Sequence, residues 1–362
     1  MASTAGSAHS GAPPEVVCLG ESMVTFLPCR PGRLADVPAF ERSIGGAESN
    51  VACTLAGLGH RAAWISRVGA DGFGDHLVRT IAAAGVDTRA VGRDPVRPTG
   101  IYFRTDGERP TAVAAVPAPA HGEPAPGART AEVAYYRAGS AASAMSPRTV
   151  DTAAADAGRV LHLTGITAAL SGDCLELLRL LTAPRPGRPL VSFDVNYRAS
   201  LWRTPAAARV LLELARGCDL VFVGEDEAEA AWGLGGGPEA LRAALPEPAV
   251  LVVKQGARGA TAFTGGPEDG RRVPAPRVDV VGQVGAGDAF AAGFLSATLR
   301  GLPVRDRLRH GHLLAAAALT VPGDLARPPA RESADRLAAL HAGEWGTLRL
   351  GPGWTTKKAS AP

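Results

Sequence analysis

The chain has 362 residues, of which 46% are hydrophobic and 20% charged, enough for one large α/β domain or two small ones. Its formal net charge of +3 is too small to indicate a nucleic-acid surface, although it suits an anionic substrate. The five cysteines form no CxxC pair, which argues against a disulfide scaffold or a zinc site. The N-terminus lacks the pattern of a signal peptide, and no apolar run is long enough to span a membrane. We therefore expect a soluble, cytoplasmic protein that binds neither nucleic acid nor membranes.

The first hundred residues alternate between strand and helix patterns, after a small, polar stretch at 1–14 that we expect to be disordered. The helix predictions rest on apolar positions spaced for one face and on a glycine just past each end. The predicted strands lie within 15–27 and at 40–44 and 64–68, and the predicted helices at 47–58 and 75–84.

Two strand-like segments, 99–104 and 111–116, flank the dipeptide Asp106-Gly107. Asp-Gly between two such segments is typical of a hairpin turn. The Pro-rich stretch at 117–130 predicts a flexible, exposed loop inserted into the domain.

From residue 160 onward, strands and helices alternate regularly, and the strands are almost continuously apolar. This pattern predicts a parallel sheet covered by helices on both faces, with an active site at the carboxyl ends of the strands. The later predicted elements are a hairpin at 260–274, helices at 289–299, 308–319 and 331–342, and a loose tail at 344–362.

The most informative motif is Gly285-Ala286-Gly287-Asp288, which opens an apolar helix. Two glycines allow a backbone to approach an anion closely, and the amides at a helix N-terminus favour phosphate. A carboxylate in the same turn would repel phosphate, unless it is a base that deprotonates a hydroxyl while the amides hold the transferred group. The motif therefore predicts a phosphotransferase with Asp288 as the base.

Gly45 and Gly46 open an earlier helix that carries Asn50, and a ligand-binding turn and a plain helix cap explain them equally well. Tyr102 and Arg104 share one face of a predicted strand, where they could cover an anionic ligand or belong to an ordinary exposed ribbon. Tyr135-Tyr136-Arg137 is a weaker cluster of the same kind.

Polar residues also follow three of the later strands. Asp194, Asn196 and Arg198 would alternate onto one face if their strand continued, and this convergence favours a site over a solvated strand end. The segment from Lys254 to Gly259 suits a turn beside a nucleotide or a plain tight turn. Acidic residues begin the helix at 225, where they complement its dipole, and Glu227 could reach a metal through water.

The sequence lacks the motifs that are typical of several other enzyme classes. The sequence contains no GxxxxGK[ST] P-loop, no GxGxxG at the first strand–helix turn, no HExxH and no GxSxG.

The GGAESN helix, the Asn-x-Arg strand end and GAGDAFAAGF together resemble the PfkB, or ribokinase-like, carbohydrate kinases, from about residue 15 to 343. The resemblance implies a three-layer α/β fold with a mostly parallel sheet. It also implies a small β-sheet lid, formed by strands within about 24–45 and 97–118. ATP with Mg²⁺ would be the donor, Asp288 the base, and the amides of Gly285, Ala286 and Gly287 the anion hole.

The motifs and the resemblance together give the predicted ligand contacts. The acceptor contacts are Gly45, Gly46, Asn50, Tyr102, Arg104, Arg198 and Asp288. The nucleotide contacts are Asn196, Glu227, Lys254, Gly256, Gly259, Gly285 and Gly287, with Glu227 also reaching the metal through water.

Within this family, the strings GGAESNVA, IYFR, YYRAGSAAS and FDVNYRASLW look most like those of 2-keto-3-deoxygluconate kinases, which phosphorylate the terminal hydroxyl of a keto sugar acid. Arg104 and Arg198 suit a carboxylate-bearing acceptor, although Arg198 could instead serve the ATP phosphates. A neutral-sugar kinase (of the fructokinase or ribokinase type) or nucleoside kinase of the same family, an NAD-dependent dehydrogenase and a non-catalytic sugar sensor stay open as alternatives. An exposed lid edge favours a homo-oligomer.

Two positions depart from the family pattern. Gly282 and Gln283 stand where the family has Asp and then Thr or Cys, which leaves open whether a monovalent cation is needed. Gly224 replaces an Asn while Glu227 keeps the Glu, so we expect the outer shell of the metal to differ.

Overall fold

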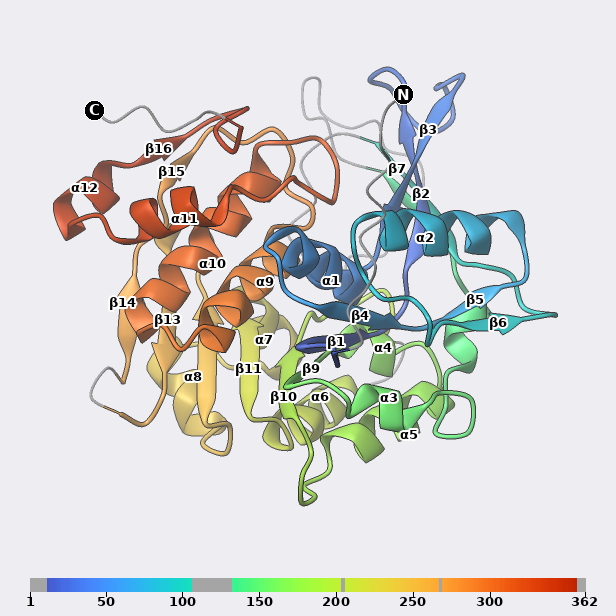
Figure 1. Cartoon of the computed structure of the whole chain (residues 1–362), viewed down its shortest axis with the longest axis horizontal. Coiled ribbons are helices and arrows are strands. Elements are labelled where there is room, and N and C mark those ends of the chain that lie inside the picture. The colour runs from blue at the N-terminus through green and yellow to red at the C-terminus, as the bar shows by residue number, and fades with distance from the viewer. Residues whose placement is uncertain (1–11, 106–131, 203–205, 267–268, 357–362) are drawn as a thin grey trace.

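Apolar segments form an eight-stranded central sheet (Figure 1) in a computed structural model that describes residues 12–105, 132–202, 206–266 and 269–356. The strands from β12 to β4 pair in parallel, whereas β13 and β14 form an antiparallel edge. Across the sheet the order is β14 (Arg271–Val273), β13 (Ala260–Phe263), β12 (Val250–Lys254), β11 (Leu220–Gly224), β10 (Leu190–Asp194), β9 (Val160–Thr164), β1 (Val16–Leu19) and β4 (Ala62–Ile65).

Helices cover both faces of this sheet because successive strand residues point to opposite sides. On β1, Val16 and Cys18 belong to one buried cluster, and Val17 and Leu19 belong to the other. The first face carries α1 (Ala47–Gly57), α2 (Gly72–Ala83), α9 (Ala286–Leu299), α10 (Val304–Leu319) and α11 (Arg331–Ala338). The second carries α5 (Gly172–Thr182), α6 (Ala207–Arg216), α7 (Glu225–Trp232) and α8 (Pro238–Ala244). The predicted three-layer fold is confirmed.

A second sheet continues from the carboxyl end of β1 and contains the strands predicted for the lid. Its order is β3 (Phe40–Gly45), β2 (Met23–Pro28), β7 (Ile101–Arg104) and β8 (Val133–Tyr136). Phe26 and Phe103 stack with ring centroids 4.7 Å apart and join β2 to β7. The predicted hairpin partner at 111–116 and the flexible loop at 117–130 lie outside the described residues, and the described antiparallel partner of β7 is β8.

Several shorter elements lie between these strands and helices. They are β5 (Arg67–Gly69), β6 (Gly92–Asp94), the 3-10 helices η1 (Ala141–Ala144) and η2 (Gly256–Arg258), α3 (Thr152–Ala155) and α4 (Gly165–Ala168). The strand predicted within 15–27 is divided at Gly20 into β1 and β2. Most of the N-terminal stretch predicted to be disordered, residues 1–11, lies outside the described part of the chain.

The prediction of a loose tail from residue 344 is wrong as far as Leu350. Residues here form α12 (Ala342–Thr347) and β16 (Arg349–Leu350), which pairs with β15 (Arg277–Val278). The side chain of Trp345 is fully buried, and its indole N–H donates to the carbonyl of Pro274 at 2.8 Å. One buried aromatic side chain therefore fixes a segment too short to show a periodic pattern.

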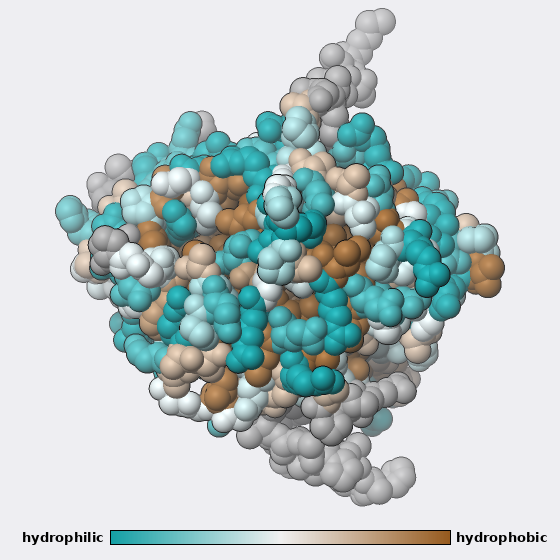
Figure 2. Space-filling view, turned by 90° about the horizontal axis from the view of Figure 1, so that it is seen from below, coloured by the Kyte–Doolittle hydropathy of each residue, from teal (hydrophilic) through white to brown (hydrophobic). Residues whose placement is uncertain are grey.

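The surface and the thiols agree with the composition. No helix in the described part of the chain is long and apolar enough to cross a membrane. Figure 2 shows a mostly hydrophilic face, with hydrophobic side chains in small, separate groups. The cysteines are free, and all except Cys29 are buried.

Candidate active site

The turn that begins α9 is shaped by Gly285, which has the left-handed φ of 76°. A Cβ atom at this position would collide with the backbone carbonyl oxygen of Asp324. Both constraints require glycine. The first amides of α9 have no acceptor within the helix, so the segment 285–288, called here the anion turn, presents N–H groups suited to an anion.

Asp288 lies in the first turn of α9, as predicted, and is half-buried. Burial raises the pKa of its carboxyl group to about 7, even though a hydrogen bond from Asn50 opposes the shift, and the nearby charge of Asp194 raises it further. The Asn50 amide donates to Asp288 Oδ2 at 2.8 Å. A carboxyl group with this pKa can accept a proton near neutral pH.

Asn50 is held in place by the start of α1. Glu48, two residues earlier, is fully buried and accepts hydrogen bonds from Thr164 at 2.8 Å and Thr167 at 2.7 Å. Burial raises the pKa of Glu48 to about 7. These bonds tie the GGAESN segment to the end of β9, so α1 and α9 bring Asn50 and Asp288 together.

A mixed cluster of charges lies at the carboxyl ends of β10, β11 and β12. Lys254 Nζ donates to both carboxylate oxygens of Asp194 at 2.9 Å and lies 4.0 Å from Glu227. Burial lowers the pKa of Lys254, but the charges of Asp194 and Glu227 outweigh this effect and raise it. Arg198 is half-exposed and lies 3.5 Å from Glu227. The charges of Lys254 and Arg198 also act on Asp288.

The strand that was to carry residues 194, 196 and 198 on one face does not continue, because β10 ends at Asp194. Asn196 has a left-handed φ of 40°, and its buried Oδ1 has no hydrogen-bond partner among the described residues. A left-handed residue, not a continuing strand, therefore follows β10, and Arg198 lies near Glu227.

Tyr102 and Arg104 point from β7 to a residue that the sequence analysis missed. The Tyr102 hydroxyl donates to Asp324 Oδ2 at 2.5 Å, and Arg104 Nη2 lies 3.1 Å from Asp324 Oδ1. Arg104 also donates to the carbonyl oxygen of Pro322 at 2.8 Å. A Cβ atom on Gly45 would lie 2.5 Å from Asp324 Oδ2, so the absence of a side chain at Gly45 makes room for this network.

The other predicted glycines have structural roles. Gly46 precedes α1, and a Cβ atom there would lie 2.5 Å from the backbone oxygen of Glu21. Gly256 and Gly259 both have positive φ and flank the tight turn between β12 and β13. Gly287 lies in the anion turn near Lys254 Nζ. Glu227 Oε2 accepts the backbone N–H of Gly224 at 2.9 Å, so it also caps α7.

Two ion pairs thus escaped the sequence analysis. Asp324 follows Gly323 in a loop after α10, more than 200 residues away from its partners, and no periodic pattern marks it. Arg137, noted only as part of a weak cluster, forms a buried ion pair with Glu21, which also accepts from Ser140. A single sequence does not show which arginine and carboxylate side chains on separate elements lie close together.

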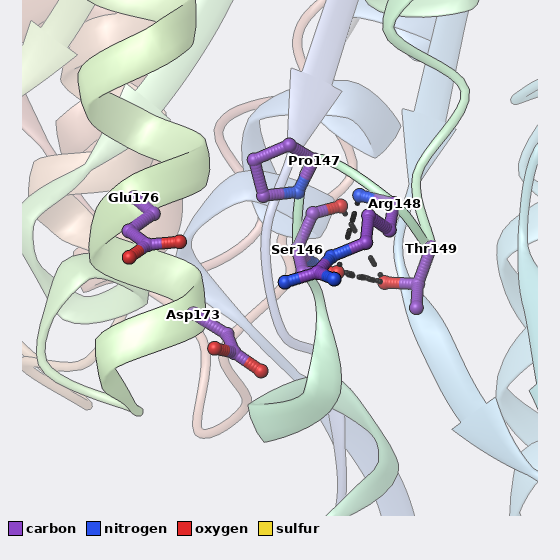
Figure 3. A pocket seen from close by; sticks show the side chains of 6 residues that line it. All are labelled: Ser146, Pro147, Arg148, Thr149, Asp173 and Glu176. Atoms are coloured by element: carbon purple, nitrogen blue, oxygen red, sulfur yellow. Dashed lines mark hydrogen bonds between the residues drawn. The ribbon is translucent and has the colours of Figure 1, made fainter.

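A surface hollow of about 350 Å³ lies elsewhere, between the 146–149 segment and α5 (Figure 3). It is lined by Ser146, Pro147, Arg148, Thr149, Asp173 and Glu176. None of these residues belongs to the predicted site, so the hollow is separate from the charged cluster around Asp288.

Comparison with known proteins agrees with this arrangement. The sequence pattern of the family described as "pfkB family carbohydrate kinase" matches residues 13–126 and 125–331. The chain belongs to the pfkB family of carbohydrate kinases. Its membership accounts for the glycine-rich start of α9, the parallel sheet and the second, smaller sheet.

Three relatives of this kinase are informative. The 2-dehydro-3-deoxygluconokinase of Bacillus subtilis is 33% identical over 88% of this chain and 93% of its own length. The 2-dehydro-3-deoxygluconokinase of Thermoproteus tenax is 35% identical over 90% of this chain and 94% of its own. A PfkB protein from Polaromonas sp. JS666 has a crystal structure that matches with a TM-score of 0.73 and 33% identity, covering 90% of this chain and 100% of that one.

The Asp194–Lys254 pair gives a stability prediction. Lys254→Met should lower the free energy of unfolding by about 3 kcal/mol, because it leaves Asp194 buried without its counter-charge. The double variant Asp194→Asn/Lys254→Met should recover most of this loss, because no unpaired charge is then buried. Urea unfolding of both variants measures the difference, and a loss below about 1 kcal/mol for the single variant would contradict the pairing.

Proposed function

We propose that this kinase transfers the γ-phosphoryl group of ATP to the terminal hydroxyl of a keto sugar acid. The substrate we favour is 2-keto-3-deoxygluconate, also called 2-dehydro-3-deoxygluconate, with the 6-phosphate as product. The observation that carries the proposal is Asp288, a carboxyl group with a raised pKa in the first turn of a helix that presents free amides. The names of the two curated relatives point to the same acceptor.

In the proposed mechanism, Asp288 takes the proton of the acceptor hydroxyl as that oxygen attacks the γ-phosphorus, and the bond from this phosphorus to the ADP oxygen breaks so that ADP leaves. Asn50 holds Asp288 Oδ2, which fixes the direction of the carboxyl group. The amides at 285–287 hold the phosphoryl oxygens as negative charge develops on them. The protein supplies little covalent chemistry beyond this, since orientation and charge neutralisation dominate phosphoryl transfer.

For the nucleotide, we propose contacts from Asn196, Lys254, Gly256, Gly259 and the anion turn. Asn196 contributes an unpaired amide oxygen, and Lys254 a cation beside Gly287. No group of three or more potential metal ligands occurs among the described residues. Glu227 would hold Mg²⁺ through water. When bound, Mg²⁺ would neutralise charge on the phosphates.

For the acceptor, we propose contacts from Gly45, Gly46, Asn50, Tyr102, Arg104 and Arg198. Arg198 is the best candidate for the carboxylate, because its guanidinium group is half-exposed and its described ion-pair partner, Glu227, is 3.5 Å away. Arg104 has less capacity to bind the acceptor carboxylate, because Asp324 and Pro322 already bind one of its nitrogens. Burial and the charge of Asp324 raise the pKa of Tyr102 well above its ordinary value, so its hydroxyl stays protonated.

A neutral-sugar kinase of the same family is the second candidate, since the base and the anion turn do not depend on an acid group. We further propose a cytoplasmic location, which suits free cysteines, and a homo-oligomer that covers the exposed side chains of Tyr135 and Tyr136 on β8.

Asp288→Asn should lower kcat by about 10²- to 10⁴-fold, because the amide cannot accept the proton. For the wild type, kcat/KM should rise with pH around an apparent pKa of about 7. Ionisation of this half-buried carboxyl group lowers the stability of the fold as the pH rises from 3.8 to about 7, so the neutral Asn variant should have an unchanged or higher Tm. Near-full turnover of a folded variant would exclude Asp288 as the base.

Arg198→Ala should raise the KM for the keto acid roughly 10- to 100-fold, the effect of losing a charge-assisted hydrogen bond, and should change the KM for ATP less than about twofold. Arg179→Ala is the matched control, because the side chain of Arg179 is similarly exposed and pairs with Glu213 between α5 and α6. If the KM for ATP rises instead, Arg198 binds the nucleotide phosphates and the carboxylate proposal fails.

A further inference from the structure

The two faces of the smaller sheet have different neighbours. Successive residues of a strand point to opposite sides, so Tyr102 and Arg104 share one face of β7 while Phe103 lies on the other. Phe103 stacks on Phe26 of β2, so its face is packed with aromatic side chains of the sheet itself. Tyr102 and Arg104 both bind Asp324, so their face is the one turned toward the candidate active site.

Tyr135 on β8 belongs to the face that carries Tyr102. The register of the two strands places Tyr135 directly opposite Tyr102 and Tyr136 directly opposite Ile101. Side chains that are directly opposite on paired strands lie on the same face, and the rings of Tyr102 and Tyr135 are in contact, with centroids 5.3 Å apart. Tyr136 instead contacts Phe103. These two neighbouring tyrosines therefore point to opposite sides of the sheet.

Tyr135 keeps a large exposed surface, although two side chains contact its ring. The exposed fraction is 43% for Tyr135 but only 5% for Tyr102. The guanidinium group of Arg137 lies 5.8 Å from the centroid of the Tyr135 ring, and a buried ion pair with Glu21 holds this arginine in turn. Because Tyr102 and Arg137 set the orientation of the ring before a ligand binds, little ordering is needed when it does.

The ring of Tyr135 continues a wall of residues that we assign to the acceptor. A Cβ atom on Gly45 would collide with the hydroxyl group of Tyr102, so Gly45 and Tyr102 are neighbours, and Tyr135 follows next to Tyr102. Sugars and sugar acids carry polar groups along a carbon chain, and the C–H groups of this chain are apolar. Aromatic side chains with a few polar groups placed beside them are typical of sites for such small molecules.

We propose that Tyr135 is a further acceptor-binding residue, whose exposed ring surface packs against the carbon chain of the substrate beside Tyr102. The inference rests on the proposed function, but it applies to a neutral sugar as well as to a keto acid, because the contact is apolar. The ring touches the acceptor and not the transferred phosphoryl group. It therefore acts on the KM for the acceptor and leaves the chemical step almost unchanged.

The first test compares variants of the two neighbouring tyrosines. The acceptor is whichever of 2-keto-3-deoxygluconate, fructose and ribose the wild type uses with the highest kcat/KM. Tyr135→Ala should raise the KM for this acceptor about tenfold or more, and should change kcat and the KM for ATP less than about threefold. Tyr135→Phe keeps the ring and should stay within about threefold of the wild-type KM.

Tyr136→Ala is the matched control for this comparison. Tyr136 is the next residue on the same strand and is also exposed, but its side chain lies on the opposite face. This variant should match the wild type. Equal KM values for Tyr135→Ala and Tyr136→Ala would overturn the inference. A shift of oligomeric state by sedimentation velocity that accompanies equal KM increases in both variants would also overturn it, because the tyrosines would then act through assembly.

The second test needs neither turnover nor a truncated side chain. Nitration by tetranitromethane is followed by mass spectrometry at Tyr135 in the Tyr136→Phe protein and at Tyr136 in the Tyr135→Phe protein, with ADP and each of the three acceptors. A bound acceptor should slow nitration of Tyr135 about fivefold or more and that of Tyr136 less than about twofold. Equal protection of both tyrosines, or no protection of Tyr135 by any acceptor, would overturn the inference.

Failure of this inference can be told apart from failure of the proposed function. If the wild type phosphorylates only fructose or ribose, the keto-acid proposal fails, and the tyrosine comparison is made with the sugar that is turned over. If the wild type phosphorylates the keto acid while Tyr135→Ala has an unchanged KM, the proposed function stands and the role of Tyr135 fails.

Discussion

The site depends on the contact between Gly285 and the backbone carbonyl of Asp324. The left-handed turn at Gly285 starts α9, and the carbonyl beside it leaves no space for a side chain. Because this turn fixes where α9 begins, it also sets the direction of the first amides and the position of Asp288, which Asn50 then holds from α1. A small error here would move both the proposed anion hole and the proposed base, so on this proposal the glycine constrains catalysis as well as folding.

Opposing charges act on the pKa of Asp288, the proposed base. Asp194 and Lys254 neutralise each other at the sheet edge, and Glu227 caps α7 while remaining near Arg198. This arrangement keeps positive groups close to Asp288 without giving it a direct ion pair among the described contacts. Burial can therefore raise the pKa of Asp288 to about 7, where a direct arginine partner would have lowered it. A carboxylate base can lie beside an anion-binding turn only where nearby positive charges are close to it without pairing directly with it.

Local patterns predicted most of the fold, because strand and helix periodicities and the glycines that end helices act over short distances. The GAGD segment likewise placed Asp288 correctly at the start of α9. The sequence could not reveal Asp324, whose partners lie on β7, or the pairing of β7 with β8, because such contacts join distant segments. Trp345 shows the same limit: a single buried side chain orders the segment near the C-terminus without any repeated pattern.

The central claim is that this kinase phosphorylates a keto sugar acid, and the most direct measurement is ADP release with Mg·ATP across a panel of acceptors. The panel contains 2-keto-3-deoxygluconate, its galactonate epimer, gluconate, fructose, ribose and adenosine. The account predicts strong turnover with the keto acids and little with the others. Strong turnover with fructose, ribose or adenosine, and none with the keto acids, would contradict the acceptor while leaving the roles of Asp288 and the anion turn intact.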